Sequence, residues 1–381
     1  MNPSLSPAEL LSLVRRVFRP READRSLALL CDLPDDRVPD TPEWAERRAM
    51  LAEWQRRLWQ ARVEAGLDLV SLFAYRNVRS NNADLPAEAW QVDPRRMPDH
   101  ADRATAPRLS MERVLESHRL IIAATALSAT APLKLAAPRL GFRAATMPGF
   151  TREMLPALRL DWEQIHGRCV DLKRRIDPAA AAELRLYAGG QAALLIVDLR
   201  HRLASASGGL VTEPGTAGNL PSGETYIVPY EGELPGDPSR TRGVLPLELD
   251  GELLFYRIEG NRVVEVVGPG PVAARERTAV AAEPAYANVA ELGFGVLADY
   301  GIRPVGRVLL DEKLGPHVAF GRSDHFGGRV GAADFSSPDK VVHIDRVYLP
   351  EVQPRVRMIS VDLVDESGRR DPLFRDGGYV K

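Results

Sequence analysis

The chain has 381 residues, of which 45% are hydrophobic and 27% are charged, and its formal net charge is −2 at pH 7. This composition is ordinary for a soluble globular protein, and the length fits two domains or one large domain. The lack of a basic charge excess argues against nucleic acid and against an anionic membrane as partners.

The cysteines and the apolar stretches bear on the compartment. Cys31 and Cys169 lie far apart, and neither has a second cysteine at metal-binding spacing. This pattern predicts a reduced, cytoplasmic protein. The N-terminus shows no apolar core after a basic start, so no signal peptide is expected. The most apolar stretches, residues 120–127 and 192–199, are about eight residues long, whereas a membrane-spanning helix needs about 20.

Two helices are expected near the N-terminus. Ser6 can cap the first helix, because a proline follows in the first turn and Glu9 is placed to reach back. Its apolar residues continue at helical spacing to residue 18. Thr41, again followed by proline, begins a longer helix that ends at Gly66. Its tryptophan stripe indicates a packing face rather than a ligand site.

The next part of the chain alternates between helices and short apolar strands. Residues 76–108 are polar and rich in proline, which predicts a long surface excursion. The alternation favours an α/β layer with a mostly parallel sheet. The expected strands are residues 67–75, 120–126 and 142–147, and the expected helices are residues 110–118 and 151–176.

From about residue 182 the pattern changes to short strands separated by glycine-containing turns. Examples are Gly189-Gly190, Asp250-Gly251 and Gly260-Asn261, which favour antiparallel hairpins. One further helix is expected over residues 271–287. We therefore predict an α/β plus β fold. An α/β domain with a helical N-terminal extension would span residues 1–190, and a β-rich metal-binding domain would span residues 191–381.

Five hard ligands follow one another in the predicted β-rich part, each next to glycine or within a predicted strand. Two imidazoles and three carboxylates are donors that one or two divalent transition metals require. His343 and Asp345 are two residues apart on a predicted strand, so their side chains share one face. The candidate ligands are Glu224, Glu291, His317, His343 and Asp345.

Each of these residues, taken alone, also fits a simpler role. Glu224 fits an ordinary surface turn, and Glu291 fits a buried salt bridge to an arginine. His317 fits a neutral core histidine that bonds to the backbone. His343 and Asp345 fit a hydrogen-bonded pair without a metal. The metal interpretation depends on all five occurring together.

Four further residues are candidates for catalysis. Asp324, His325 and Glu312 could transfer protons, and His325 could instead bind substrate or lie exposed on a loop. Lys313 could stabilise a developing oxyanion. The run from residue 311 to Lys313 equally fits a structural ion pair beside the site.

Several of these runs resemble the M29 peptidase family, the thermophilic-type leucyl aminopeptidases often labelled aminopeptidase T. The runs are residues 218–224, 290–295, 311–321 and the His343-Ile344-Asp345 pair, and residues 144–149 also resemble that family. The likeness covers roughly residues 115–350. It implies an α/β N-terminal domain, a β-rich C-terminal domain, a homodimer, and two divalent ions (Zn, Mn or Co) on Glu224, Glu291, His317, His343 and Asp345. The implied activity is hydrolysis of an amide or peptide bond in a small-molecule or short-peptide substrate.

One position departs from the peptidases. Asp324 stands where they place a tyrosine shortly after the first ligand histidine, so the chain resembles an uncharacterised subgroup that lacks it. The family is related to 2,5-dihydroxypyridine 5,6-dioxygenases, in which one Fe(II) is held by two histidines and an aspartate. Those enzymes carry a histidine where Glu291 stands here, so Glu224 together with Glu291 favours the two-metal hydrolase.

Two alternatives stay open. One is a mononuclear Fe(II) dioxygenase that cleaves a hydroxylated pyridine or a similar aromatic ring. The other is a metal-stabilised binding protein without turnover.

Overall fold

The computed structural model describes residues 4–96 and 106–380. The chain divides into two compact units: residues 1–166 with 209–222, and residues 167–208 with 223–381. It passes between them within one helix and again at residues 208–209 and 222–223. The predicted division into residues 1–190 and 191–381 stays a prediction, because a division by contacts does not establish which segments fold on their own.

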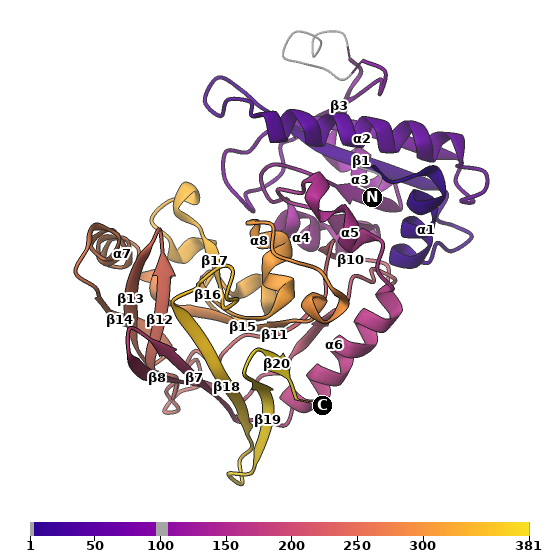
Figure 1. Ribbon diagram of the computed structural model, residues 1–381. Helices are drawn as coiled ribbons and strands as arrows, with labels where there is room; N and C mark the ends of the chain where they lie inside the picture. The colour runs from indigo at the N-terminus through magenta and orange to yellow at the C-terminus, as the bar shows by residue number, and fades with distance from the viewer. Residues whose placement is uncertain (1–3, 97–105, 381) are drawn as a thin grey trace. The chain divides into compact units, whose positions relative to one another are not determined.

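The first unit is built on a seven-stranded sheet in the order β10-β6-β5-β1-β2-β3-β4 (Figure 1). The pairs from β10 to β2 are parallel, and β3 and β4 add an antiparallel edge. β1 is buried along nearly its whole length, as is usual where helices cover both faces of a parallel sheet. The strands are β1 (Ser26–Leu33), β2 (Leu69–Arg76), β3 (Glu88–Gln91), β4 (Arg108–Ser110), β5 (Leu120–Ala123), β6 (Arg143–Thr146) and β10 (Thr216–Asn219).

Helices flank this sheet. In α1, Ser6 accepts from the Glu9 amide and the Glu9 carboxylate accepts from the Ser6 amide, so the predicted cap is confirmed. Thr41 caps α2, which packs against β1 and β2. The helices are α1 (Pro7–Phe18), α2 (Pro42–Gln60), α3 (Met111–Ser117), α4 (Thr130–Leu140), η2 (Arg152–Met154), α5 (Leu155–Leu158) and α6 (Trp162–Ile176), through which the chain leaves the unit.

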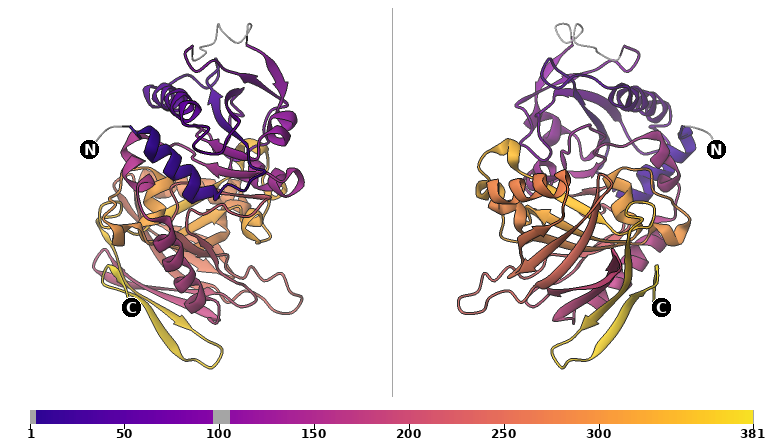
Figure 2. Two further views of the ribbon diagram at one scale, coloured as in Figure 1. Left: turned by 90° about the vertical axis from the view of Figure 1, so that its right-hand side faces the viewer. Right: turned by 60° about the vertical axis from the view of Figure 1, so that its left-hand side comes forward.

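The second unit contains an eight-stranded antiparallel sheet in the order β14-β13-β12-β8-β7-β18-β19-β20. β7 alternates between buried and more exposed side chains, the pattern of a strand with one covered face. Figures 1 and 2 show β18 and β19 side by side as long yellow arrows. The strands are β7 (Ala181–Ala188), β8 (Gln191–Asp198), β12 (Arg242–Leu249), β13 (Glu252–Glu259), β14 (Arg262–Val267), β18 (Val356–Val364), β19 (Arg370–Arg375) and β20 (Gly378–Tyr379).

A five-stranded antiparallel sheet in the order β17-β16-β15-β11-β9 completes this unit. Its strands are β9 (Ser205–Ser207), β11 (Glu224–Ile227), β15 (Val289–Gly295), β16 (Pro316–Gly321) and β17 (His343–Val347). The helical segments are α7 (Pro271–Ala282), η3 (Pro284–Ala287), η4 (Leu297–Tyr300), α8 (Val308–Asp311), η5 (Glu312–Leu314), η6 (Asp324–Phe326), η7 (Ala332–Asp334) and η8 (Pro338–Lys340). The predicted α/β plus β fold is confirmed.

Some local predictions were wrong. Residues 26–33 had no predicted strand but form β1, the central strand of the seven-stranded sheet. The stretch 76–108 contains β3 and the start of β4, and its residues 97–105 lie outside the described residues. Residues 151–176 form the short segments η2 and α5 and the 15-residue helix α6 rather than one helix. The Asp161 side chain accepts from the Glu163 amide at 3.0 Å, which favours a new helix start at Trp162. The helix from Pro271 stops at Ala282, just before Pro284.

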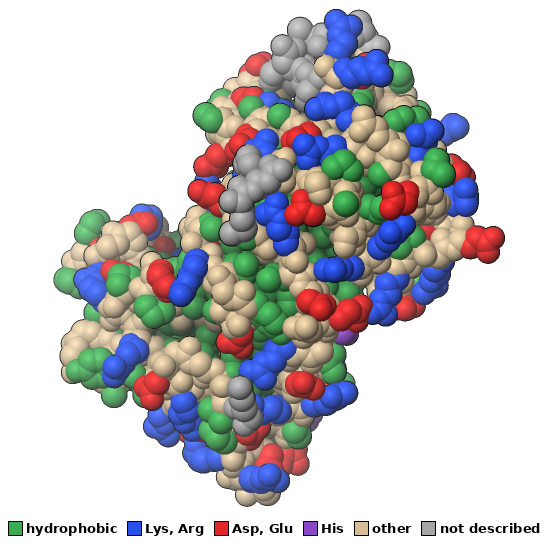
Figure 3. All heavy atoms as spheres, turned by 45° about the vertical axis from the view of Figure 1, so that its right-hand side comes forward, with side chains coloured by type: hydrophobic (Ala, Val, Ile, Leu, Met, Phe, Trp, Pro, Cys, Tyr) green, Lys and Arg blue, Asp and Glu red, His purple; other side chains and the backbone are tan. Residues whose placement is uncertain are grey.

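Two observations concern the surface. No helix in the described part of the chain is long and apolar enough to cross a membrane. On the face drawn in Figure 3, basic and acidic side chains are interspersed rather than gathered by sign, which agrees with the small net charge.

Candidate metal centre

All five candidate ligands lie on one face of the five-stranded sheet. On β11, Glu224 is paired with Gly295 of β15. On β15, Glu291 is paired with Ala319 of β16, which is paired in turn with Asp345 of β17. Because residues paired across a sheet point to the same side, these carboxylates share a face.

The two histidines join this face through the same register. His317 is paired with Gly293 of β15, and His343 is paired with Gly321 of β16. Each ligand thus has glycine or alanine as its partner on at least one neighbouring strand, which leaves room for the ligand side chain. The opposite face carries Leu292, Phe294, Val318 and Phe320, which are fully buried and anchor the sheet in the core.

Gly293 makes room for the His317 ring. A Cβ atom built on Gly293 would lie 2.0 Å from Nε2 and 2.2 Å from Cε1 of His317, far inside van der Waals contact. The imidazole therefore lies over the glycine.

We expect Gly293→Ala to weaken binding of a divalent ion at His317 by about 10- to 100-fold, because the new methyl group displaces a ligand ring. Calorimetric titration with Mn²⁺ measures this effect. Gly167→Ala in α6 is the control, since a Cβ there meets nothing within 4 Å. Wild-type affinity in Gly293→Ala would contradict the placement of His317.

The ligand atoms form two groups that share one carboxylate. One group contains Glu224, Glu291 and His317, and the other contains Glu291, His343 and Asp345. Within each group the candidate donor atoms lie within 4.8 Å of one another. Either group could hold a metal ion, and in the described part of the chain no group brings both histidines together.

Glu291 stands between the two imidazoles. Its Oε1 lies 3.2 Å from His317 Nε2, and its Oε2 lies 3.3 Å from His343 Nε2. Glu224 Oε2 lies 3.5 Å from His317 Nε2, and Asp345 Oδ1 lies 3.7 Å from His343 Nε2. The partners of Glu291 are thus imidazoles, not the arginine that a structural salt bridge would supply.

Backbone carbonyls orient both rings. The Nδ1 of His317 lies 3.2 Å from the Gly315 carbonyl oxygen, and the Nδ1 of His343 lies 2.7 Å from the Arg322 carbonyl oxygen. When Nδ1 donates to these oxygens, Nε2 faces the carboxylates. Histidines that bind metals are commonly oriented in this way.

The residues fit a metal ion for a further reason. Glu224 Oε2 is buried and has no hydrogen-bond partner among the described residues. A buried carboxylate oxygen that accepts no hydrogen bond is costly, and a cation would satisfy it. The side chains of His343 and Asp345 are 12% and 8% exposed, whereas His317 is fully buried, so the His343 end of the site is the more exposed one.

The ionisation of these groups is strongly linked. Burial opposes the charge on Glu291, but hydrogen bonds from His317 and His343 lower its pKa to about 2. Burial likewise opposes the charge on His317, but Glu291 and Glu224 raise its pKa to about 9. The pKa of His343 is raised well above its usual range by Asp345 and Glu291 despite burial. Without a metal, protons on the two imidazoles hold the carboxylates together.

Glu312 and Lys313 lie beside the ligands. The Lys313 ammonium donates to Glu224 Oε1 at 2.5 Å and also to Glu312 Oε1. Burial raises the pKa of Glu312 well above its usual range. A hydrogen bond from Glu312 helps to lower the pKa of Asp345. The ion pair considered from the sequence is therefore present, but it includes the predicted ligand Glu224.

Asp324 and His325 lie on η6. Arg322 binds Asp324 through Nε at 2.6 Å and Nη2 at 3.2 Å, and His325 Nδ1 lies 3.5 Å from the same carboxylate. Despite partial burial, hydrogen bonds from His325 and Arg322 hold the pKa of Asp324 well below its usual range. The His325 ring lies 5.3 Å from that of His343.

Three residues near the site escaped the sequence predictions. Tyr226 is two residues after Glu224 on the same strand and therefore on the same face, a signal that strand periodicity contains. Its ring lies 4.7 Å from that of Phe326, which lies 5.4 Å from His343. Glu231 accepts from Ser323 Oγ at 2.6 Å and thereby holds the loop that carries η6. No local sequence pattern indicates this contact.

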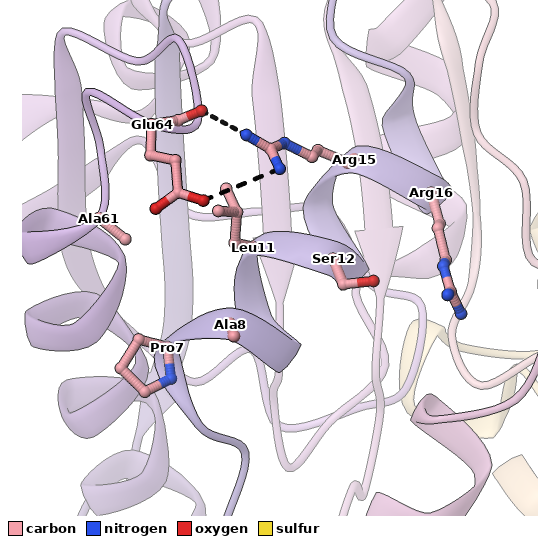
Figure 4. Close-up of a pocket in the computed structure, with 8 residues that line it drawn as sticks. All are labelled: Pro7, Ala8, Leu11, Ser12, Arg15, Arg16, Ala61 and Glu64. Atoms are coloured by element: carbon pink, nitrogen blue, oxygen red, sulfur yellow. Dashed lines mark hydrogen bonds and ion pairs between the residues drawn. The ribbon is translucent and has the colours of Figure 1, made fainter.

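A separate cavity of about 550 Å³ lies in the first unit, along one side of α1 (Figure 4). Figure 4 shows Arg15 directed toward Glu64, whose backbone oxygen accepts from Arg15 Nη2 at 2.5 Å. The residues that line this cavity include none of the predicted site residues.

Comparison with solved structures shows the fold. The chain is similar to 2,5-dihydroxypyridine dioxygenase from Pseudomonas putida KT2440, with 14% identity, coverage of 99% of this chain and 98% of that chain, and a TM-score of 0.63. It is also similar to wild-type AmpT from Thermus thermophilus, with 17% identity, coverage of 98% and 99%, and a TM-score of 0.56. No protein-family model and no curated protein matches the chain. At these identities the likeness shows a shared fold alone.

Proposed function

We propose that this protein is an enzyme of the M29 aminopeptidase type, a metal-dependent hydrolase that cleaves an amide or peptide bond. The observation that carries the proposal is the position of Glu291, whose two oxygens each face one imidazole. A carboxylate in this position could contribute a ligand atom to each of the two groups. The motif resemblance and the fold shared with AmpT add support.

Two divalent ions would be held by Glu224, Glu291 and His317 on one side and by Glu291, His343 and Asp345 on the other. When bound, such ions polarise a carbonyl group and lower the pKa of water toward neutrality. Zn, Mn and Co suit this mixed oxygen and nitrogen donor set.

The chain's own residues would move protons beside that centre. Burial raises the pKa of Glu312, so its carboxyl group is the first candidate to exchange protons with a leaving amine. His325 lies next to His343 and is the second candidate for this role. Asp324 is a weak base because Arg322 holds it ionised, so its proposed role is to orient His325.

Lys313 is proposed to hold Glu224 rather than to meet substrate. Its side chain is 2% exposed and its ammonium already binds two carboxylates, which leaves it little capacity to stabilise an oxyanion. The substrate is proposed to be a small amide or short peptide. A homodimer and a cytoplasmic location stay predictions.

An Fe(II) dioxygenase is the second candidate. The structure shares its fold with a 2,5-dihydroxypyridine dioxygenase, and His317, His343 and Asp345 all belong to the site. Against it, the two histidines lie in different ligand groups, separated by Glu291. A single ion bound by two histidines and one aspartate requires those three side chains to converge.

Metal reconstitution tests the proposal. Protein treated with a chelator should be inactive, and Zn²⁺, Mn²⁺ or Co²⁺ should restore cleavage of leucine p-nitroanilide or a dipeptide as two ions bind per chain. The N-acetylated substrate is the control, because an aminopeptidase requires a free amine.

Two results would overturn this assignment. Saturation at one Fe(II), with O₂-dependent turnover of 2,5-dihydroxypyridine, would identify the dioxygenase. Metal binding that raises the melting temperature, with no cleavage across free and blocked amides, would indicate a binding protein without turnover.

A further inference from the structure

A buried cation lies at one side of the candidate metal centre. Lys313, in η5, is 1% exposed. Its Nζ lies 2.5 Å from Glu224 Oε1, and it also contacts Glu312 Oε1. A buried ammonium keeps its charge only where carboxylates compensate for the lost hydration, and both of these carboxylates are buried.

The two ligand groups therefore have unequal surroundings. In the group of Glu224, Glu291 and His317, one oxygen of Glu224 is already bound to the ammonium, so only Oε2 is free to bind an ion. In the group of Glu291, His343 and Asp345, the ion pairs among the described residues join these carboxylates to imidazoles, and Lys313 is separated from Asp345 by the Glu312 side chain, which hydrogen-bonds to Asp345.

Other cations do not compensate for this difference. Arg322, whose carbonyl oxygen lies 2.7 Å from His343 Nδ1, has its guanidinium bound to Asp324 through two nitrogens. Arg346 follows Asp345 on β17, so it points to the opposite face, where it binds the Tyr286 hydroxyl at 2.9 Å.

We propose that Lys313 makes the two metal positions unequal, so that the position of Glu291, His343 and Asp345 fills first and the position of Glu224, Glu291 and His317 fills only at higher metal concentration. The inference rests on the two-metal centre proposed above. A fixed positive charge a few Å from an ion in a buried site opposes binding strongly, because little solvent screens it. The expected difference in Kd is at least about tenfold.

Titration of the metal-free full-length chain with Mn²⁺, followed by calorimetry and by equilibrium dialysis, tests the proposal. Wild-type protein should show two classes of site. Glu224→Gln should abolish the weaker class and leave the tighter class unchanged. Asp345→Asn should abolish the tighter class. The opposite assignment of classes to these two variants would overturn the proposal.

Substitution of the lysine tests the cause. Lys313→Met keeps most of the side-chain volume but removes the charge, so it should tighten the weaker class by about tenfold or more and bring the two Kd values together. Lys313→Arg keeps the charge and should keep the classes apart. Unchanged separation in Lys313→Met would overturn the role of the ammonium.

The outcomes separate this inference from the proposed function. Two sites of equal affinity in the wild type would overturn the inference and leave the two-metal hydrolase standing. One ion at every Mn²⁺ concentration would contradict the two-metal function. In that case Lys313→Met should create a second site, and its failure to do so would overturn the inference as well.

The folding of the variants does not limit the test. Circular dichroism and a thermal melt establish whether Lys313→Met folds. If it does not fold, the test is which class of site is lost in Glu224→Gln and which is lost in Asp345→Asn, because neither variant removes the buried cation.

Discussion

Replacing Glu291 by glutamine is expected to reduce the bound divalent metal from two ions per chain to at most one. Cleavage of an amide substrate should fall by on the order of 10³-fold or more. The reason is geometric, because the Glu291 oxygens each face a different imidazole, at 3.2 and 3.3 Å. An amide retains one oxygen and loses the negative charge, so it can no longer bridge.

Inductively coupled plasma mass spectrometry of dialysed protein measures the stoichiometry, and p-nitroanilide release measures turnover. The matched control is Glu276→Gln, which removes another buried carboxylate of the same unit. Glu276 Oε2 accepts from the hydroxyls of Tyr256 at 2.5 Å and Tyr286 at 2.8 Å. This control should lower stability by about 1–3 kcal/mol and keep both ions. Two ions in Glu291→Gln would contradict the bridging role.

The second large effect concerns pH. His317 titrates with a pKa of about 9 in the metal-free fold, against 6.5 when unperturbed. A group whose pKa is raised by folding stabilises the native state fully below its unfolded pKa, and this stabilisation is lost as pH rises through its folded pKa. Metal-free protein should therefore lose on the order of 3 kcal/mol between pH 6.5 and 9.

Metal-bound protein should lack this dependence, because an imidazole that binds a metal through Nε2 carries no titrating proton there. Urea unfolding at several pH values, with and without metal, measures the difference. Metal affinity should rise over the same range, since fewer protons must be displaced, and calorimetry in buffers of different ionisation enthalpy counts them. His317→Gln should reduce the dependence, and the part that persists is expected from His343, whose pKa is also raised. Metal-free stability that is constant or rises from pH 6.5 to 9 would contradict the assignment.

Local patterns in the sequence were sufficient for part of the fold. The Ser6 and Thr41 caps were predicted because capping depends on residues within one helical turn. The change from helix–strand alternation to glycine-separated strands predicted the fold class for a similar reason. β1 escaped prediction although residues 27–31 form a short apolar run like residues 120–127. The return of residues 209–222 to the first unit escaped prediction because it does not depend on local periodicity.

The candidate metal centre was likewise predictable from the sequence only in part. The sequence alone determined which residues carry metal-binding donors, and the two-residue period of a strand placed His343 and Asp345 on one face. It did not determine which carboxylate lies between the imidazoles, nor that Lys313 binds Glu224. Those facts depend on the register among β11, β15, β16 and β17, including the bulge in β15 before Glu291.

Register was decided only by the tertiary structure, and the reason is physical. The apolar residues on the far face of this sheet, such as Leu292 and Phe320, pack into a core formed by distant segments. A register shift of one residue would move these apolar side chains to the ligand face and the ligands to the core face. Hydrophobic packing on one face therefore sets the distances between charged groups on the other, and no single segment contains that information.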